Sequence, residues 1–213
     1  MDGVTKPGET ASELRSYGGE AGDARVARRR AALIDASLDM LTEPDVGTVT
    51  VRGICARAGL TPRYFYESFD NVDALARATY DGVIAEIAER AAAAFARGGD
   101  ARGKVRAAVE AIVDVIESDP RTGRLIFSDT LRSPVLAGRR ADSLQLFANL
   151  TSESAAQVAR VGQADETMAA AHFQVGGLGR VLASWTEGRL DLDRDRLVAV
   201  CVRMMLPITA ERS

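Results

Sequence analysis

Apolar residues recur at helical spacing from Arg25 onward. Steps of three and four residues separate successive apolar positions, which predicts a helix with one buried face. The stripe consists of Ala27, Ala31, Ile34, Leu38 and Leu41. Pro44 and Gly47 follow it and predict the end of this helix.

Two much shorter helices are predicted next. Thr50 is a suitable N-cap for the first, which carries Ile54 inward and ends at Gly59. Thr61 caps the second, with Pro62 at its first position, where a missing N–H costs nothing.

The rest of the chain also has helical periodicity. Asn71 caps a long helix that ends near Gly98-Gly99, and Asp119-Pro120 marks a further break. Later apolar stripes predict helices over about 105–116, 125–127, 136–161, 166–187 and 193–206. No segment shows the alternation of a strand. The sequence predicts an all-α protein of about nine helices, preceded by a flexible arm over residues 1–24 that is rich in Gly, Ser, Thr and Glu.

Four aromatic residues fall within six positions, although aromatic residues make up only 5% of the chain. Phe65 and Phe69 lie four residues apart, so they share one helix face and suit a core. Tyr64 and Tyr66, with Arg63, then point elsewhere. Two short helices joined by a Gly-containing turn after a longer helix are typical of a helix-turn-helix, whose second helix lies in the DNA major groove. The alternative is that the two tyrosines simply fill the core.

The composition agrees with a helical protein that has a sizeable core. Hydrophobic residues make up 46% of the 213 residues, and only six are proline. No apolar run approaches the roughly 18 residues that span a bilayer, and no leader with a basic start and an apolar middle is recognisable. Cys55 and Cys201 lie in apolar helical stretches without metal-ligand spacing. We therefore expect a reduced, cytoplasmic protein that does not contact a membrane.

The charge is distributed unevenly. Residues 1–24 carry two basic and five acidic side chains, whereas residues 25–80 carry eight arginines against seven acids. Four of these arginines are Arg25, Arg28, Arg29 and Arg30. This locally basic segment is compatible with phosphate contacts, and equally with a solvated helix face.

The sequence offers few residues that could form a catalytic site. His172 is the only histidine, so neither a catalytic triad nor a histidine-based metal site is available. The glycines of Gly176-Gly177-x-Gly179 lack the Lys-Ser/Thr partner of a phosphate loop. We expect no enzyme activity, no catalytic residues, no metal and no cofactor. Glycines inside a helix cost about 1 kcal/mol each, and close approach of a dimer partner would explain their presence.

Residues 50–69 resemble the tetracycline-repressor (TetR) family of bacterial regulators. TVRGICARAGLT followed by PRYFYESF is similar to the family's Thr-led helix, its Ile-Ala-x-x-Ala-Gly-Val-Ser turn and its Tyr-x-x-Phe recognition helix. The resemblance spans roughly residues 26–96. It implies a homodimeric transcriptional regulator, usually a repressor, that binds a palindromic site on double-stranded DNA and responds to a small-molecule effector.

The resemblance also implies roles for individual residues. Arg52 and Tyr64 correspond to base-facing positions, and Pro62 and Arg63 stand at the front of the recognition helix. The phosphate contacts would be Thr50, Thr61 and Tyr66.

Three positions depart from the family pattern. Ser68 stands where the family usually has His, Val72 where it has Lys, and Cys55 where it has Ala. Without the lysine one phosphate contact is lost, so DNA affinity would depend more on arginines elsewhere.

The implied domain organisation is a DNA-binding domain over 25–72, a connecting helix over 73–98, and a ligand-binding and dimerisation domain over 99–213. The last domain offers apolar wall residues and a few polar groups for a mostly apolar effector. The candidate pocket residues are Ile112, Ile116, Phe127, Phe147, Leu150, Thr151, His172, Phe173 and Gln174. The alternative is that these residues fill a core.

The last two helices would form the four-helix interface of the dimer. Their apolar positions exceed what one bundle face needs. The candidate contacts are Gly176, Gly177, Leu178, Val181, Leu182, Leu197, Cys201 and Met204.

Two other functions remain open at this stage. An effector-independent DNA-binding regulator would have a tightly packed second domain without a cavity. An all-helical enzyme with an N-terminal three-helix bundle would need a constellation of acids, bases or metal ligands, which the sequence does not offer.

Overall fold

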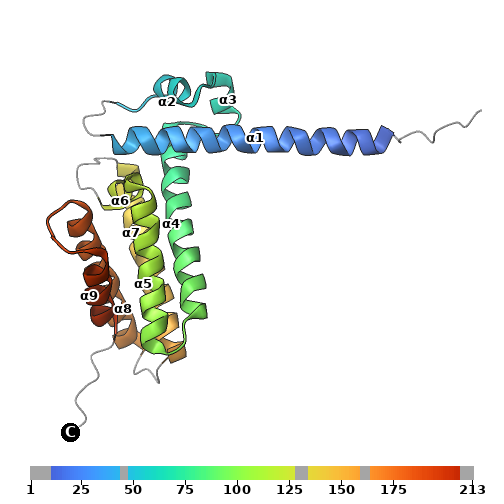
Figure 1. Cartoon of the computed structure of the whole chain (residues 1–213). Helices are drawn as coiled ribbons and strands as arrows, with labels where there is room; N and C mark the ends of the chain where they lie inside the picture. The colour runs from blue at the N-terminus through green and yellow to red at the C-terminus, as the bar shows by residue number, and fades with distance from the viewer. Residues whose placement is uncertain (1–10, 44–47, 128–133, 159–163, 207–213) are drawn as a thin grey trace, which may run out of the picture.

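The computed structural model describes residues 11–43, 48–127, 134–158 and 164–206, and every regular element within these ranges is a helix (Figure 1). The predicted all-α fold of about nine helices is confirmed. The helices are α1 Ala11–Thr42, α2 Val51–Ala58, α3 Pro62–Tyr66, α4 Val72–Arg97, α5 Ala101–Ser118, α6 Pro120–Phe127, α7 Pro134–Val158, α8 Ala164–Thr186 and α9 Arg194–Met205. None of these described helices is long and apolar enough to cross a membrane.

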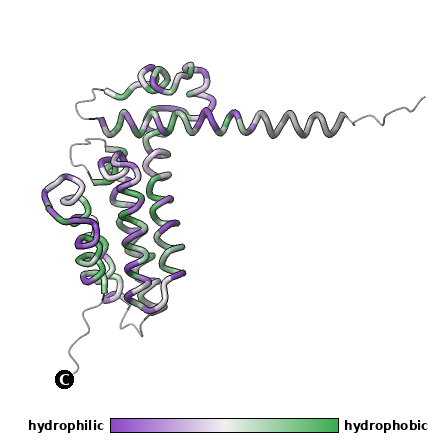
Figure 2. The backbone as a smooth tube through the Cα atoms, in the orientation of Figure 1, coloured by the Kyte–Doolittle hydropathy of each residue, from purple (hydrophilic) through white to green (hydrophobic). Residues whose placement is uncertain are grey.

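The helices form two parts. We call α1, α2, α3 and the start of α4 the head, and the rest of α4 with α5–α9 the body. α1 lies across the end of the body, with α2 and α3 on its far side, and α4 runs from the head down the length of the body (Figure 1). The head has its own core around Leu33, Ile54, Phe65 and Leu75. Along each helix of the body, hydrophobic and hydrophilic residues follow one another in short stretches, as expected for a helix with one buried face (Figure 2).

The predicted helix boundaries around the head are confirmed by their caps. The Thr50 hydroxyl oxygen accepts from the Gly53 amide at 3.2 Å, and the Asn71 side-chain oxygen accepts from the Ala74 amide at 2.8 Å. Gly59 has a φ of 65°, a left-handed conformation that suits glycine, and it ends α2.

The predicted side-chain cap at Thr61 is wrong. Pro62 does occupy the first helical position, but the Thr61 hydroxyl caps nothing. The Tyr64 amide, which such a cap would bind, donates instead to the backbone oxygen of Thr61 at 3.0 Å.

Two predictions about α1 are also wrong. The helix begins at Ala11, so residues 11–24 of the predicted flexible arm are helical, while residues 1–10 lie outside the described residues. Extending an anchored helix adds one hydrogen bond per residue without a new nucleation cost. The predicted buried face is wrong for Ala27 and Ala31, which are exposed, but Leu38 is buried as predicted, and Ile34 and Leu41 pack against the cores.

Candidate nucleic-acid interface and apolar cavity

Helix α3 is held to the head by its two phenylalanines. Phe65 is completely buried, and the Phe69 ring packs against it with ring centres 6.1 Å apart. Both belong to the core that Ile54 of α2 and Leu75 of α4 complete. The predicted core role of Phe65 and Phe69 is confirmed, and it fixes which face of α3 points away from the protein.

The outward face of α3 carries Arg63 and Tyr66. Tyr66 is 62% exposed, and the side chain of Arg63 is exposed beside Glu67, to which its Nε donates at 3.1 Å. Tyr64 is half-buried because the Arg29 guanidinium carbon lies 4.1 Å from the centre of its ring. The alternative that the two tyrosines fill the core is therefore wrong for Tyr66, which is exposed. Tyr64 is partly covered by Arg29 of α1.

The remaining predicted DNA contacts lie on α2 and on the turn before α3. Thr50, Arg52, Thr61 and Pro62 are all exposed. Arg52 makes no hydrogen bond or ion pair with any other residue that the structure describes. Of the seven residues predicted to contact DNA, six are thus exposed and Tyr64 is half-buried.

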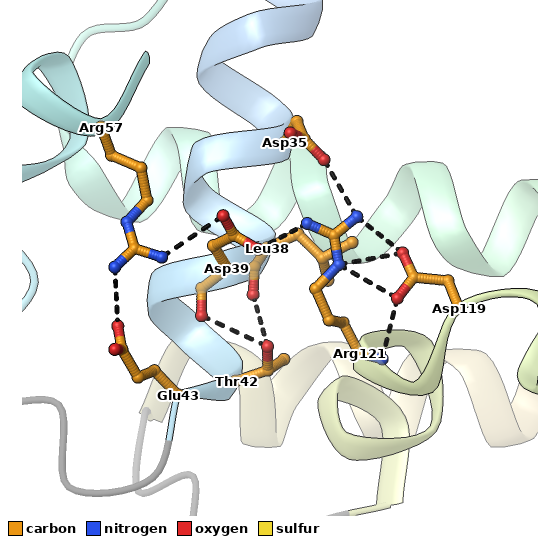
Figure 3. A network of polar contacts seen from close by, with 8 residues as sticks. All are labelled: Asp35, Leu38, Asp39, Thr42, Glu43, Arg57, Asp119 and Arg121. Atoms are coloured by element: carbon orange, nitrogen blue, oxygen red, sulfur yellow. Dashed lines mark hydrogen bonds and ion pairs between the residues drawn. The ribbon is translucent and has the colours of Figure 1, made fainter. Parts of the chain in front are cut away.

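A chain of ion pairs joins the body to the head (Figure 3). Arg121 of α6 reaches Asp119 at 2.7 Å and two aspartates of α1, Asp35 at 3.0 Å and Asp39 at 2.6 Å. Arg57 of α2 extends this chain by pairing with the same Asp39 at 3.3 Å.

These contacts alter the acidity of the groups involved. Hydrogen bonds from Arg121 lower the pKa of Asp39 and of Asp119. The same bonds raise the pKa of Arg121, so all three groups stay charged over a wide pH range. Sequence reasoning did not find this network. Its only sequence signal is the pair Asp35 and Asp39, which are one helical turn apart and share a face.

The body contains an apolar cavity of about 1070 Å³ lined mainly by α4, α5, α6, α7 and α8. Its walls are mostly aliphatic and aromatic, and α4 contributes Ala88, Ala91 and Ala92. Two buried polar groups meet in the wall, where the hydroxyl oxygens of Tyr80 and Ser143 are 3.0 Å apart. Burial raises the pKa of the Tyr80 phenol, which is therefore a neutral hydrogen-bonding group. Sequence reasoning missed both residues.

Most of the predicted pocket residues line this cavity. The seven that do are Ile112, Ile116, Phe127, Phe147, Leu150, Thr151 and Gln174. His172 and Phe173 do not, since both are exposed on the outer side of α8 and Phe173 is 83% exposed. The prediction is wrong for these two because α8 turns Val175 and Leu178 inward, which leaves the residues just before Gln174 facing out.

The predicted dimer contacts divide into three groups. Leu182, Leu197 and Cys201 are buried in the chain's own core and Val181 packs against it, so they offer little or no surface to a partner. Gly176 and Leu178 line the cavity instead. Among the predicted contacts, Gly176, Gly177 and Met204 are exposed on α8 and α9, and the dimer contact itself stays a prediction.

No other part of the described chain packs closely against the α8 glycines. A Cβ added at Gly176, Gly177 or Gly179 would meet nothing within 4 Å in the structure. Packing inside one subunit therefore gives no reason for them.

The described parts of the body and head contain no metal-ligand cluster and no reactive thiol. No group of three or more His, Cys, Asp or Glu side chains there is arranged to hold a metal ion. Both cysteines are buried, and burial raises the pKa of the Cys201 thiol to about 11. A thiol of this acidity is almost entirely protonated at neutral pH and is a poor nucleophile.

Neither a protein-family model nor a curated protein sequence matches the chain. Solved structures do. The fatty acid degradation regulator FadR of Bacillus halodurans superposes with a TM-score of 0.72 at 18% identity, over 86% of this chain and 97% of that one. A putative TetR-family regulator of Syntrophomonas wolfei gives a TM-score of 0.70 at 12% identity, over 83% and 92%.

FadR of Bacillus subtilis in complex with stearoyl-CoA is a third example. It has a TM-score of 0.66 at 14% identity, over 82% of this chain and 95% of that one. At such identities the likeness concerns the fold. The chain has the fold of the TetR-family transcriptional regulators.

Proposed function

We propose that the protein is a transcriptional regulator that binds a palindromic DNA site as a homodimer and is released from it by a small, mostly apolar effector. One observation carries the proposal: α4 connects an exposed α3 directly to the wall of a large apolar cavity. Near its start Leu75 packs in the core that holds Phe65, and further along Tyr80, Ile84 and Ile87 line the cavity.

The coupling needs a free-energy difference between two conformations. An effector releases DNA only if it binds the DNA-free conformation more tightly than the DNA-bound one. Moving the population from 99:1 to 1:99 takes about 5.5 kcal/mol of differential binding, which two symmetric sites would share. A small tilt of α4 would shift α3, because the two helices are joined by only five residues, 67–71.

The cavity supports an effector-responsive regulator over one without an effector. A body that served only as packing would not keep about 1070 Å³ of apolar space. The polar groups in the wall, including Thr151, Gln174 and the Tyr80–Ser143 pair, suit a ligand with a few oxygen atoms on a long apolar frame. FadR of Bacillus subtilis, which has a similar fold, was solved in complex with stearoyl-CoA. Fatty acyl compounds are therefore the first class to test.

The dimer would form through the outer side of α8 and α9. Phe173 and Met204 are large apolar side chains that are 83% and 59% exposed. Gly177, four residues after Phe173, would let a partner helix approach closely. Two recognition helices related by a dyad would read half-sites about 34–36 Å apart or at a multiple of that distance.

The experiment is a selection of bound sites from random duplex DNA, followed by a ligand screen on the best site. The screen should include fatty acids and their CoA thioesters from about 8 to 20 carbons. A cationic polycyclic compound and a neutral polycyclic compound represent other ligand classes. We expect a palindromic consensus and at least one compound that releases it. Absence of any enriched sequence would refute the regulator, whereas enrichment without release by any compound would favour an effector-independent one.

A further inference from the structure

The N-terminal part of α1 projects past the recognition helix. Among the α1 side chains that the structure describes, from residue 22 onward, those of residues 23–28 are all exposed and the first buried one is Leu33. Figure 1 shows that this part of α1 extends beyond α3 and that no other helix lies beside it. Packing within the described chain does not explain the side chains of residues 23–28.

The arginines of this projection continue the surface of α3. Arg29 contacts α3 over the Tyr64 ring at 4.1 Å, and it pairs with Glu67, the residue directly after α3, at 3.8 Å. Arg25 lies four residues before Arg29, about one helical turn, and therefore on the same side of α1.

Arg25 and Arg28 carry charge that nothing within the described structure neutralises. Both are exposed, and neither makes a hydrogen bond or an ion pair with another described residue. The acid Asp23 is two residues from Arg25, about 200° around the helix, so it faces away from that arginine.

We propose that α1 carries a second DNA contact, in which Arg25 and Arg28 bind backbone phosphates that flank the base pairs read by α3. The inference rests on the proposed function. Arg25 is about 6 Å beyond Arg29 along the helix, which corresponds to roughly two nucleotides at 3.4 Å per strand position. The contact is independent of base sequence, because phosphates are the same at every position.

Charge and position favour DNA over a protein partner at this surface. Arg25 shares the side of α1 on which Arg29 meets Tyr64 of α3. Arg28 is exposed three residues further along, so one polyanion could contact these arginines together with the exposed face of α3. Val26 is the only large apolar residue among the exposed residues 23–28, which leaves a protein partner little to bury.

The test compares the full-length protein with the double variant Arg25→Gln/Arg28→Gln. Arg97→Gln/Arg102→Gln is the matched control, since both residues are exposed and partnerless near the turn between α4 and α5, at the end of the body far from α3. Affinity is measured against salt concentration for the best selected site and for a 30-base-pair duplex of scrambled sequence. Each lost phosphate contact lowers the slope of log K against log[salt] by about 0.9.

We expect the slope for the double variant to fall by about 1.8 per bound chain on both duplexes, and that of the control to stay unchanged. Arg25→Lys/Arg28→Lys should restore the slope, because a phosphate accepts either cation, and it separates charge from helix distortion. An unchanged slope, or a loss confined to the selected site, would overturn the inference while leaving the regulator intact. Failure of the unmodified protein to bind either duplex would overturn both proposals.

Discussion

At the residue scale, the five-residue helix α3 depends on side chains rather than on its own hydrogen bonds. A helix this short is unstable alone, so the burial of Phe65 and Phe69 fixes its position. The same packing leaves Arg63 and Tyr66 outside and places Tyr64 at the edge, under Arg29. The alternation of buried and exposed aromatic residues thus separates the supporting function from the proposed DNA contacts.

Substitution of the two tyrosines should have different effects on DNA binding. Tyr64→Ala or Arg52→Ala should reduce discrimination between the selected site and a single-base mismatch by about 1–3 kcal/mol, because the proposed function gives each a base-facing role. Tyr66→Phe should weaken all duplexes equally, since a hydroxyl that donates to a phosphate carries no sequence information. Competition binding with matched and mismatched duplexes measures both. A change of preferred sequence in Tyr66→Phe would show that the roles are assigned wrongly.

At the element scale, the sequence predicts helices well and the faces they bury less well. The caps at Thr50, Asn71 and Asp193 have local side-chain signals, and all three side chains accept the expected amide. The inward side of α8 could not be predicted, because apolar and small residues occur around much of that helix and only the neighbouring helices decide which ones are covered. Phe173 therefore looked like a wall residue although it lies outside.

The ion pairs between α6 and α1 were equally hidden, because they join residues far apart in sequence. Arg121 and Asp39 are 82 positions apart, and no local pattern links them. The direct contact between α6 and the head adds a second connection to the one that α4 makes. A ligand that moves α6 would act on α1 through Arg121.

The substitution Arg121→Gln should destabilise the protein by about 1 kcal/mol at neutral pH, because these side chains are partly exposed. The folded-state pKa values of Asp39 and Asp119 are lowered. Their contribution is therefore present above the unfolded value near 4 and is lost as pH falls through the folded values. Urea unfolding from pH 3 to 7 should show a difference from the unmodified protein that is constant above about pH 5 and shrinks below pH 4.

The control for this prediction is Arg106→Gln, which breaks only the exposed pair with Glu110 on α5. It should change stability by no more than about 0.5 kcal/mol. A pH-independent difference in Arg121→Gln would indicate that lost packing, and not charge pairing, explains the destabilisation.

At the scale of the whole molecule, one subunit leaves two features that its own packing does not explain. The outer side of α8 and α9 exposes large apolar side chains, and the body contains an apolar cavity. Dimerisation would cover the first and an effector would fill the second. Both were expected from the sequence in outline, but only the structure separates the residues that face the cavity from those that face outward.

The dimer is tested by Phe173→Glu, which places a charge on the most exposed of the large apolar side chains described. Burying an unpaired carboxylate in an interface is strongly unfavourable, so sedimentation at micromolar concentration should show a monomer. Leu146→Glu is the control, because Leu146 is also exposed but lies on α7, which is not one of the two helices of the proposed interface. A dimer that persists in Phe173→Glu would place the interface elsewhere.

The cavity is tested by Leu150→Trp, a bulky substitution in its wall. The larger ring should occupy space that an effector needs and so weaken the response to a confirmed inducer. Affinity for DNA without effector should remain nearly unchanged, because Leu150 lines the cavity of the body and does not belong to the head. Leu146→Trp adds the same ring to α7 outside the cavity and should leave induction intact. Titrating the inducer against preformed protein–DNA complexes measures each response. If Leu150→Trp responds to the inducer as the unmodified protein does, the effector binds elsewhere and the route through α4 has to be abandoned.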